Sequence, residues 1–190
     1  MQALVLCPTR ELAEQVGAEL RRLARLLPNL RVVTLCGGVP VRTQIPSLQT
    51  TPQVVVGTPG RILDHCRRGS LALGELRVLV LDEADRMLDM GFIDEITAIV
   101  AQTPAARQSL LFSATFPAEI RALSRRLQRE PVTVTVDTQV QDAELTQVFY
   151  EVAAADKLAA LLALLAEQRP ESALVFCHTR SDAQQLAQEL

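Results

Sequence analysis

The sequence predicts an α/β fold, a parallel sheet with flanking helices. Short, continuous apolar runs of strand length recur along the chain, and helical patterns lie between several of them. Continuous rather than alternating apolar strands are typical of parallel sheets that are covered on both faces. The predicted strands lie at about 3–7, 31–36, 53–57, 77–82, 109–113 and 132–136.

The helices between these strands are predicted from their periodicity and their end residues. After the first strand, apolar side chains recur at three- and four-residue steps, the stripe of an amphipathic helix. They are Leu12, Val16, Leu20, Leu23 and Leu27. Shorter helices are predicted at 62–68, 92–102 and 117–127, the last with Pro117 in its first turn.

Two units are predicted, residues 1–137 and residues 147–190, joined by a polar linker at 138–146 that has no apolar period. The predicted elements of the second unit are strands at 147–152 and 173–177 and helices that begin at Asp156 and Ser181. A unit of this size rarely buries enough surface to fold alone. Because the chain opens in a strand and stops within a helix, we expect both ends to be cut.

Composition is that of an ordinary globular protein, with 48% apolar and 22% charged residues. The net charge of −3 would by itself count against a nucleic-acid partner. Binding needs a local cationic surface rather than a basic total, however, so the charge does not exclude such a partner. Lys157 is the only lysine, and the remaining cations are arginines, which suit bidentate phosphate contacts.

The four cysteines lack the spacing of a zinc site, so no structural metal is predicted. They are Cys7, Cys36, Cys66 and Cys177. All but Cys66 end apolar runs, which predicts buried thiols in a reducing compartment. No apolar stretch reaches membrane length, so we expect a cytoplasmic protein with no membrane partner.

An acidic motif follows the predicted strand at 77–82. Asp82 lies where that strand ends, at the sheet edge where α/β proteins bind ligands. Its carboxylate can hold Mg²⁺ through water, and Glu83 can deprotonate an attacking water. The alternative is a simple helix N-cap, which an isolated Asp-Glu pair would favour.

Hydroxyl groups end another predicted strand at Ser113 and Thr115. They can bond Asp85 or a water that is linked to a γ-phosphate. Ordinary turn and capping chemistry before Pro117 explains them equally well when they are taken alone.

Three further turns combine hydroxyls, arginines or bare backbone with the start of a helix, which suits phosphate oxygens. They contain Pro8, Thr9 and Arg10; Thr58, Pro59, Gly60 and Arg61; and, in the second unit, Thr179 and Arg180. Gly37 and Gly38 add backbone that a ligand can approach closely. The alternative for each turn is a surface arginine beside a chain reversal.

The ordered set of these motifs resembles the DEAD-box RNA helicases of superfamily 2. The motifs are PTRELA (8–13), GG (37–38), TPGR (58–61), DEAD (82–85), SAT (113–115) and VFCHTR (175–180). The segments LCGGVP and LDEADRMLDMGF are most similar in sequence to the bacterial DbpA type. Helicases of that type act on large-subunit ribosomal RNA. The resemblance implies RecA-like lobes, here an incomplete first lobe and the start of a second.

The same resemblance implies cofactors, a partner and residue roles. ATP and Mg²⁺ are the cofactors, with Asp82 as a water-mediated metal ligand and Glu83 activating the hydrolytic water. Asp85, Ser113 and Thr115 would couple hydrolysis to strand separation. RNA, in particular ribosomal RNA, would be bound by the turns at 8–10, 37–38, 58–61 and 179–180.

One part of an ATPase site is absent from the sequence, because no GK[ST] phosphate-binding motif occurs in it. We therefore expect the 190 residues alone to be inactive toward ATP. The resemblance also implies that the P-loop strand would lie beside the strand before SAT, so we expect that strand to form an unpaired sheet edge here. Two alternatives stay open. One is a non-catalytic RNA-binding or regulatory protein, and the other is a DNA-directed helicase.

Overall fold

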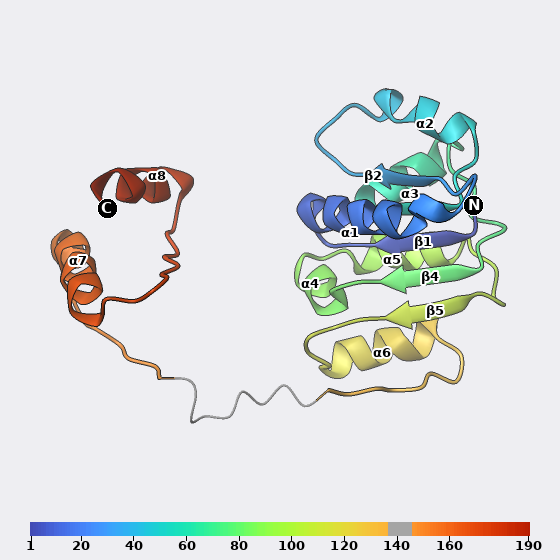
Figure 1. Ribbon diagram of the computed structural model, residues 1–190. Helices are drawn as coiled ribbons and strands as arrows, with labels where there is room; N and C mark the ends of the chain where they lie inside the picture. Colours follow the sequence, from blue (N-terminus) through green and yellow to red (C-terminus); the bar gives the residue numbers. More distant parts are fainter. Residues whose placement is uncertain (137–145) are drawn as a thin grey trace. The chain divides into compact units, whose positions relative to one another are not determined.

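The computed structural model describes residues 1–136 and 146–190 (Figure 1). These residues divide into two compact units, Met1–Val134 and Thr135–Leu190, and each unit is described by itself. The predicted linker at 138–146 lies outside the described residues except for Thr146.

The first unit is built on a five-stranded parallel sheet in the order β2-β3-β1-β4-β5. The strands are β1 (Ala3–Leu6), β2 (Val32–Leu35), β3 (Val54–Gly57), β4 (Val78–Leu81) and β5 (Gln108–Leu111). In register, Leu6 lies opposite both Gly57 and Leu81. Leu35 pairs with Gly57, and Leu111 pairs with Leu81. All five strands therefore end at the same level, which aligns the motifs that follow them.

Helices connect the strands and confirm most of the predicted ones. They are α1 (Arg10–Leu23), α2 (Ile45–Gln49), α3 (Pro59–Arg67), α4 (Ala84–Asp89), α5 (Ile93–Val100) and α6 (Ala118–Leu127). The sequence did not predict α2 or α4, which are only five and six residues long and carry no clear apolar period. Pro117 stands at the N-cap of α6 rather than inside its first turn.

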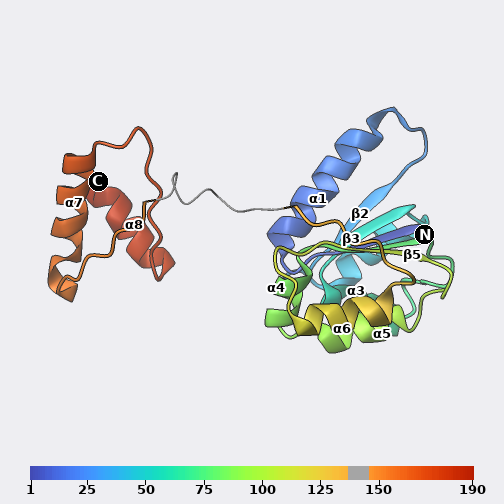
Figure 2. The same ribbon diagram turned by 90° about the horizontal axis from the view of Figure 1, so that it is seen from below.

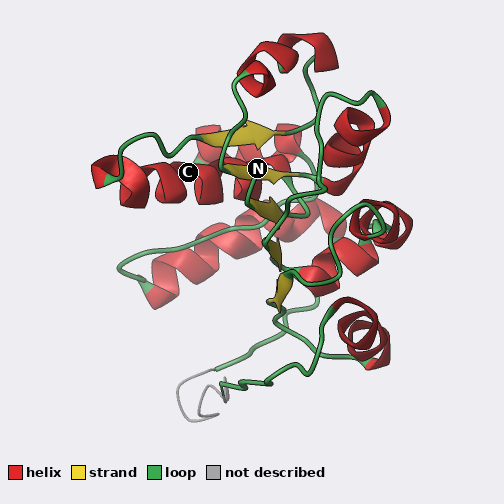
Figure 3. Cartoon of the chain, turned by 90° about the vertical axis from the view of Figure 1, so that its right-hand side faces the viewer, coloured by secondary structure: helices red, strands yellow, loops and turns green. Residues whose placement is uncertain are grey.

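The sheet separates two apolar cores. Leu4, Leu6 and Leu79 are completely buried on the face covered by α3, α5 and α6 (Figure 2). Val5 and Cys7 point to the opposite face, where they pack with Ala13 and other side chains of α1. This alternation is the period-two pattern of a pleated strand. Figure 3 shows the five strands as a twisted row with helices beside them.

The face that carries α1 is only partly covered, contrary to the prediction of a sheet covered on both faces. Helix α1 contacts β2 and β3. Val78 and Val80 of β4 remain half-buried, and Leu110 of β5 is exposed. Strand β5 also pairs with β4 alone among the described residues, so it forms the unpaired edge that was expected beside SAT.

The second unit contains α7 (Lys157–Gln168) and α8 (Arg180–Glu189), near the predicted starts of its helices. Three strand predictions are wrong, because 132–136, 147–152 and 173–177 are not strands in the structure. Their side chains are largely exposed, and Phe176 is 89% exposed. Strands are stable only when neighbours pair with them and bury one face, and no neighbouring strand is present for these runs in the described residues. For the same reason Cys177 is half-buried instead of buried.

Candidate functional site

The predicted site residues of the first unit gather at one edge of the sheet. Parallel strands that end in register bring the residues just beyond them to the same edge. Residues 7–10, 36–38, 58–61, 82–85 and 112–115 all follow such strand ends. Segments that are far apart in the sequence therefore become neighbours.

The turn at Asp82 and Glu83 is held by the strands on both sides of β4. The amide of Asp82 donates to Leu6 O at 3.0 Å, and the amide of Ala84 donates to Phe112 O at 2.9 Å. Between them, Glu83 is exposed and adopts left-handed backbone angles, φ 51° and ψ 56°. Such a conformation costs on the order of 1–3 kcal/mol in a residue with a side chain and is concentrated at functional sites.

Asp85 joins the acidic turn to the SAT turn through hydrogen bonds. Its Oδ2 accepts from the Thr115 amide at 2.9 Å and from Thr115 Oγ1 at 2.8 Å. Its own amide donates to Ser113 Oγ at 3.2 Å, and that hydroxyl donates to Thr115 O at 2.7 Å. Partial burial raises the pKa of Asp85, but these hydrogen bonds outweigh it and hold the pKa below the ordinary value of 3.8. The carboxylate is therefore kept ionised and oriented.

The donor set at this turn suits a hard cation that keeps most of its water. Asp82 is half-buried, and its Oδ1 accepts from the Glu83 amide at 3.1 Å. No group of three potential ligands gathers in residues 1–136 and 146–190, so the described residues offer no closed protein cage. Mg²⁺ is usually held by one or two carboxylates together with water and phosphate oxygens, which this arrangement allows.

The first-strand turn places Thr9 and Arg10 beside the glycine pair. Thr9 is the N-cap of α1, and its Oγ1 accepts from the Leu12 amide at 3.2 Å. The guanidinium of Arg10 lies against Gly38, whose φ is +88°, so a side chain at position 38 would collide with it. Gly38 is required here both for its backbone angle and for the close approach. Pro8 is buried under this turn.

The TPGR turn begins α3, with Thr58 at the N-cap and Pro59 in the first turn. The Thr58 hydroxyl makes no capping hydrogen bond in the described structure, and Gly60 is exposed. Arg61 is already engaged within the protein, since Nη1 donates to Gln44 Oε1 and Nη2 to Val39 O, each at 2.8 Å. Its predicted contact with RNA would have to use its remaining donors.

Thr179 and Arg180 lie in the second unit, apart from the other predicted site residues in the sequence and in the division into units. Thr179 caps α8, because its Oγ1 accepts from the Asp182 amide at 3.1 Å. The Asp182 carboxylate in turn accepts from the Thr179 amide at 3.2 Å. The hydroxyl of Thr179 thus serves as a helix cap, and Arg180 is exposed, which is compatible with the alternative of a surface arginine at a turn.

Gln44 and His65 belong to none of the sequence motifs, and sequence reasoning did not single them out. His65 is completely buried, with Nε2 3.0 Å from Gln44 Oε1 and Nδ1 2.8 Å from Ser70 Oγ. Burial and the nearby Arg61 charge lower the pKa of His65 below 6.5. The only available signal was the apolar setting of the histidine, between Leu63 and Cys66.

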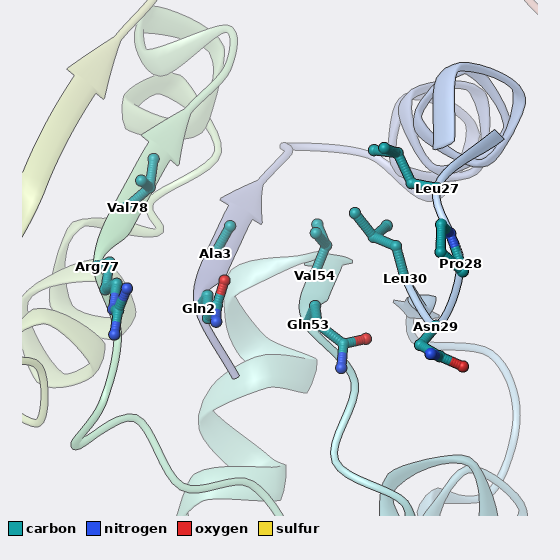
Figure 4. Close-up of a pocket in the computed structure, with 10 residues that line it drawn as sticks. All are labelled: Gln2, Ala3, Leu27, Pro28, Asn29, Leu30, Gln53, Val54, Arg77 and Val78. Carbon is teal, nitrogen blue, oxygen red and sulfur yellow. The ribbon is translucent and has the colours of Figure 1, made fainter. Parts of the chain in front are cut away.

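A separate hollow of about 430 Å³ lies at the opposite edge of the sheet, by the amino ends of the strands (Figure 4). Leu27, Leu30 and Val54 form its apolar wall, and Arg77 lies on its other side. Its place at the other ends of the strands separates it from Asp82. It is therefore not part of the candidate site.

Comparison with known proteins places this arrangement in a family. Residues 1–123 match the DEAD/DEAH box helicase family. The chain belongs to that family. It is 51% identical over its full length to the ATP-dependent RNA helicase DbpA of Escherichia coli K12. It is 46% identical to the DEAD-box ATP-dependent RNA helicase CshA of Geobacillus kaustophilus.

A solved structure supports the RecA-like fold of this DEAD-box chain. The DEAD box protein of the hyperthermophile Methanococcus jannaschii matches the whole chain with a TM-score of 0.69 and 38% identity. The chain covers 50% of that protein and 41% of the length of the DbpA and CshA proteins. No helix in residues 1–136 or 146–190 is both long and apolar enough to span a bilayer.

Proposed function

We propose that this chain supplies the water-activating carboxylates and part of the RNA path of an ATP-dependent RNA helicase. The observation that carries the proposal is the hydrogen-bonded link from Asp85 to Thr115 and Ser113. That link joins the acidic turn to the SAT turn. Both turns lie at the edge of the sheet where the predicted RNA-binding turns of the first unit also lie.

In the proposed reaction, Asp82 would hold Mg²⁺ through water and Glu83 would remove a proton from the attacking water. ATP bound with Mg²⁺ would supply the phosphoryl group that is transferred to water. The left-handed backbone of Glu83 presents its carboxylate at an exposed position next to Asp82. This role requires a carboxylate that can accept a proton from water.

Asp85 is proposed to couple movements of the acidic turn to the SAT turn that follows β5. Its carboxylate accepts two hydrogen bonds from Thr115. If one of the two turns moves, either these hydrogen bonds break or the other turn moves with it. Coupling through two such turns would link hydrolysis to local separation of an RNA duplex.

The RNA path is proposed to run along the turns that follow β1, β2 and β3. These turns offer an arginine, hydroxyls and backbone amides, which are ligands for sugar and phosphate rather than for base edges. Binding there would therefore depend little on sequence. Ribosomal RNA is the proposed natural target and the cytoplasm the proposed compartment, as the resemblance of the motifs to the DbpA type implies. Residues 147–190, with Thr179 and Arg180, would begin a second lobe beyond the 138–146 linker.

A second candidate is RNA binding without hydrolysis. It is favoured by one feature of the 190 residues, the absence of a GK[ST] motif to cradle phosphates. For the same reason we propose that these residues by themselves show no ATPase activity. An ATPase rate that disappears in Glu83→Gln would contradict that expectation.

The proposed RNA path is tested with a fluorescein-labelled 12-nucleotide oligouridylate and fluorescence anisotropy of the 190-residue chain. We expect the logarithm of the binding constant to fall linearly with the logarithm of the salt concentration. We also expect the RNA to bind more tightly than the matching deoxyoligonucleotide. Arg10→Gln should lower the salt slope by about 1, whereas Arg25→Gln, on the far end of the helical segment after β1, should not. A chain that fails to bind this RNA at 50 mM salt would refute the proposed function.

A further inference from the structure

Gln44 is the centre of a polar network that joins three segments of the first unit. Its Oε1 accepts from Arg61 Nη1 at 2.8 Å and faces His65 Nε2 at 3.0 Å. Its Nε2 donates to Cys36 O at 3.0 Å. One half-buried side chain thus connects the end of β2 with both the start and the middle of α3.

The orientation of this amide and the protonation of the histidine are fixed by their partners. Arg61 can only donate and Cys36 O can only accept, so the amide oxygen must face Arg61 and the nitrogen must face Cys36. Because Oε1 can only accept, His65 Nε2 must carry a proton. His65 Nδ1 lies 2.8 Å from Ser70 Oγ, which also donates to the His65 carbonyl oxygen at 3.1 Å. Both lone pairs of Oε1 are used, which leaves Gln44 little capacity to bind a ligand itself.

The network ends on the two carbonyl groups that flank the glycine pair. Gln44 bonds Cys36 O on one side of Gly37 and Gly38, and Arg61 bonds Val39 O on the other at 2.8 Å. Between these anchors the backbone passes through φ +88° at Gly38, against the guanidinium of Arg10. In this turn Gly38 and Val39 are exposed and Gly37 is half-buried.

We propose that Gln44 is a positioning residue that holds the 37–39 turn in the conformation that accepts the RNA backbone. Arg61 acts in the same unit, by bonding Val39 O and Gln44, and His65 supports Gln44 from the buried side. This inference rests on the proposed RNA path and adds to it a residue that makes no contact with RNA. It predicts that loss of Gln44 weakens RNA binding through the shape of the turn and not through charge.

The test compares the unchanged chain with Gln44→Leu, Gln44→Glu and the matched control Gln49→Leu. Gln49 is an exposed glutamine at the end of α2, the short helix for which Gln44 is the N-cap residue. Gln44→Leu removes all three hydrogen bonds. Gln44→Glu keeps an acceptor for Arg61 and His65 but removes the donor to Cys36 O, and it serves as the informative variant if Gln44→Leu does not fold.

Two readouts are taken, one of which requires no RNA. The first is the backbone ¹⁵N order parameter of Gly37, Gly38 and Val39, measured by NMR relaxation. The second is the anisotropy titration with the labelled oligouridylate at several salt concentrations. We expect order parameters that fall below about 0.6 at these residues with β1 unchanged, and about tenfold weaker RNA binding. Gln44→Leu, which adds no charge, should leave the salt slope unchanged. Gln49→Leu should match the unchanged chain in both.

Unchanged order parameters at residues 37–39 in the Gln44 variants, or order parameters that fall equally in β1, would refute the positioning role. So would RNA binding equal to that of Gln49→Leu, or a fall in the salt slope in Gln44→Leu. Failure of the unchanged chain to bind the RNA would instead refute the RNA path, while the order parameters would still show whether Gln44 orders the turn.

Discussion

Two segments with nearly the same sequence have different structures in the two units. Residues 3–10 read ALVLCPTR, and residues 173–180 read ALVFCHTR. In both, a threonine caps the helix that follows, with similar backbone angles at Thr9 (−122°, 160°) and Thr179 (−128°, 163°). Only the first apolar run forms a strand, at the centre of the sheet. Helix starts are determined by local residues, whereas strands require neighbours.

The largest difference between the units should appear when an apolar side chain is truncated. Leu79→Ala, at a completely buried position of β4, should lower the free energy of unfolding by about 2–5 kcal/mol. Phe176→Ala, at a side chain that is 89% exposed, should change it by less than about 0.5 kcal/mol. Urea unfolding followed by circular dichroism measures both. A cost of several kcal/mol for Phe176→Ala would mean that the second apolar run is packed after all.

The two helix N-caps, Thr9 and Thr179, should stabilise their own helices to a similar degree but differ in their effect on the unfolding of the first unit. Thr9→Ala removes a cap from a helix that is part of the folded sheet, so it should cost about 1 kcal/mol of unfolding free energy. Thr179→Ala should shorten α8, as seen in NMR secondary chemical shifts, without changing the unfolding of the first unit. Equal effects of the two changes on urea unfolding would contradict the comparison.

A smaller effect should follow from the contact between the DEAD turn and the SAT turn, a kind of contact that the described residues show in the first unit alone. Thr115→Val removes one hydrogen bond to Asp85 and should move the pKa of Asp85 up toward 3.8 in an NMR titration. Because the folded pKa of Asp85 is depressed, its stabilisation is present above the unfolded value and is lost as pH falls through the folded one. The variant should therefore lose less stability on acidification, and Thr51→Val should behave as the unchanged chain.

The smallest effect should be the pH dependence that arises from His65. Since burial and Arg61 lower its pKa, the stabilisation from the neutral ring is complete above about 6.5 and is lost as pH falls toward the folded value. His65→Gln should reduce the loss of unfolding free energy between pH 7.5 and 5.5. His178→Gln, at an exposed histidine of the second unit, should leave that loss unchanged. A larger loss in His65→Gln than in the unchanged chain would mean that the folded state prefers the charged ring.

The success of sequence reasoning followed the same division between local and distant causes. Five strands and the helices α1, α3, α5 and α6 were predictable, because each apolar run or stripe is local. The runs at 132–136 and 147–152 carry the same signal but lack a partner strand in the described residues, which no local pattern can reveal. The motifs placed Asp85 near Thr115 correctly, since both follow adjacent parallel strands. Gln44 was missed because its role depends on Arg61 and His65, which the fold brings to it.

The most direct test of the central claim is to map which amides of the chain respond to RNA. NMR chemical-shift changes would be recorded as the 12-nucleotide oligouridylate is added. The proposed site predicts the largest changes at Thr9–Arg10, Gly37–Val39 and Thr58–Arg61, at the carboxyl ends of the strands. Changes concentrated instead around Leu27–Leu30 and Gln53, at the opposite edge of the sheet, would contradict it.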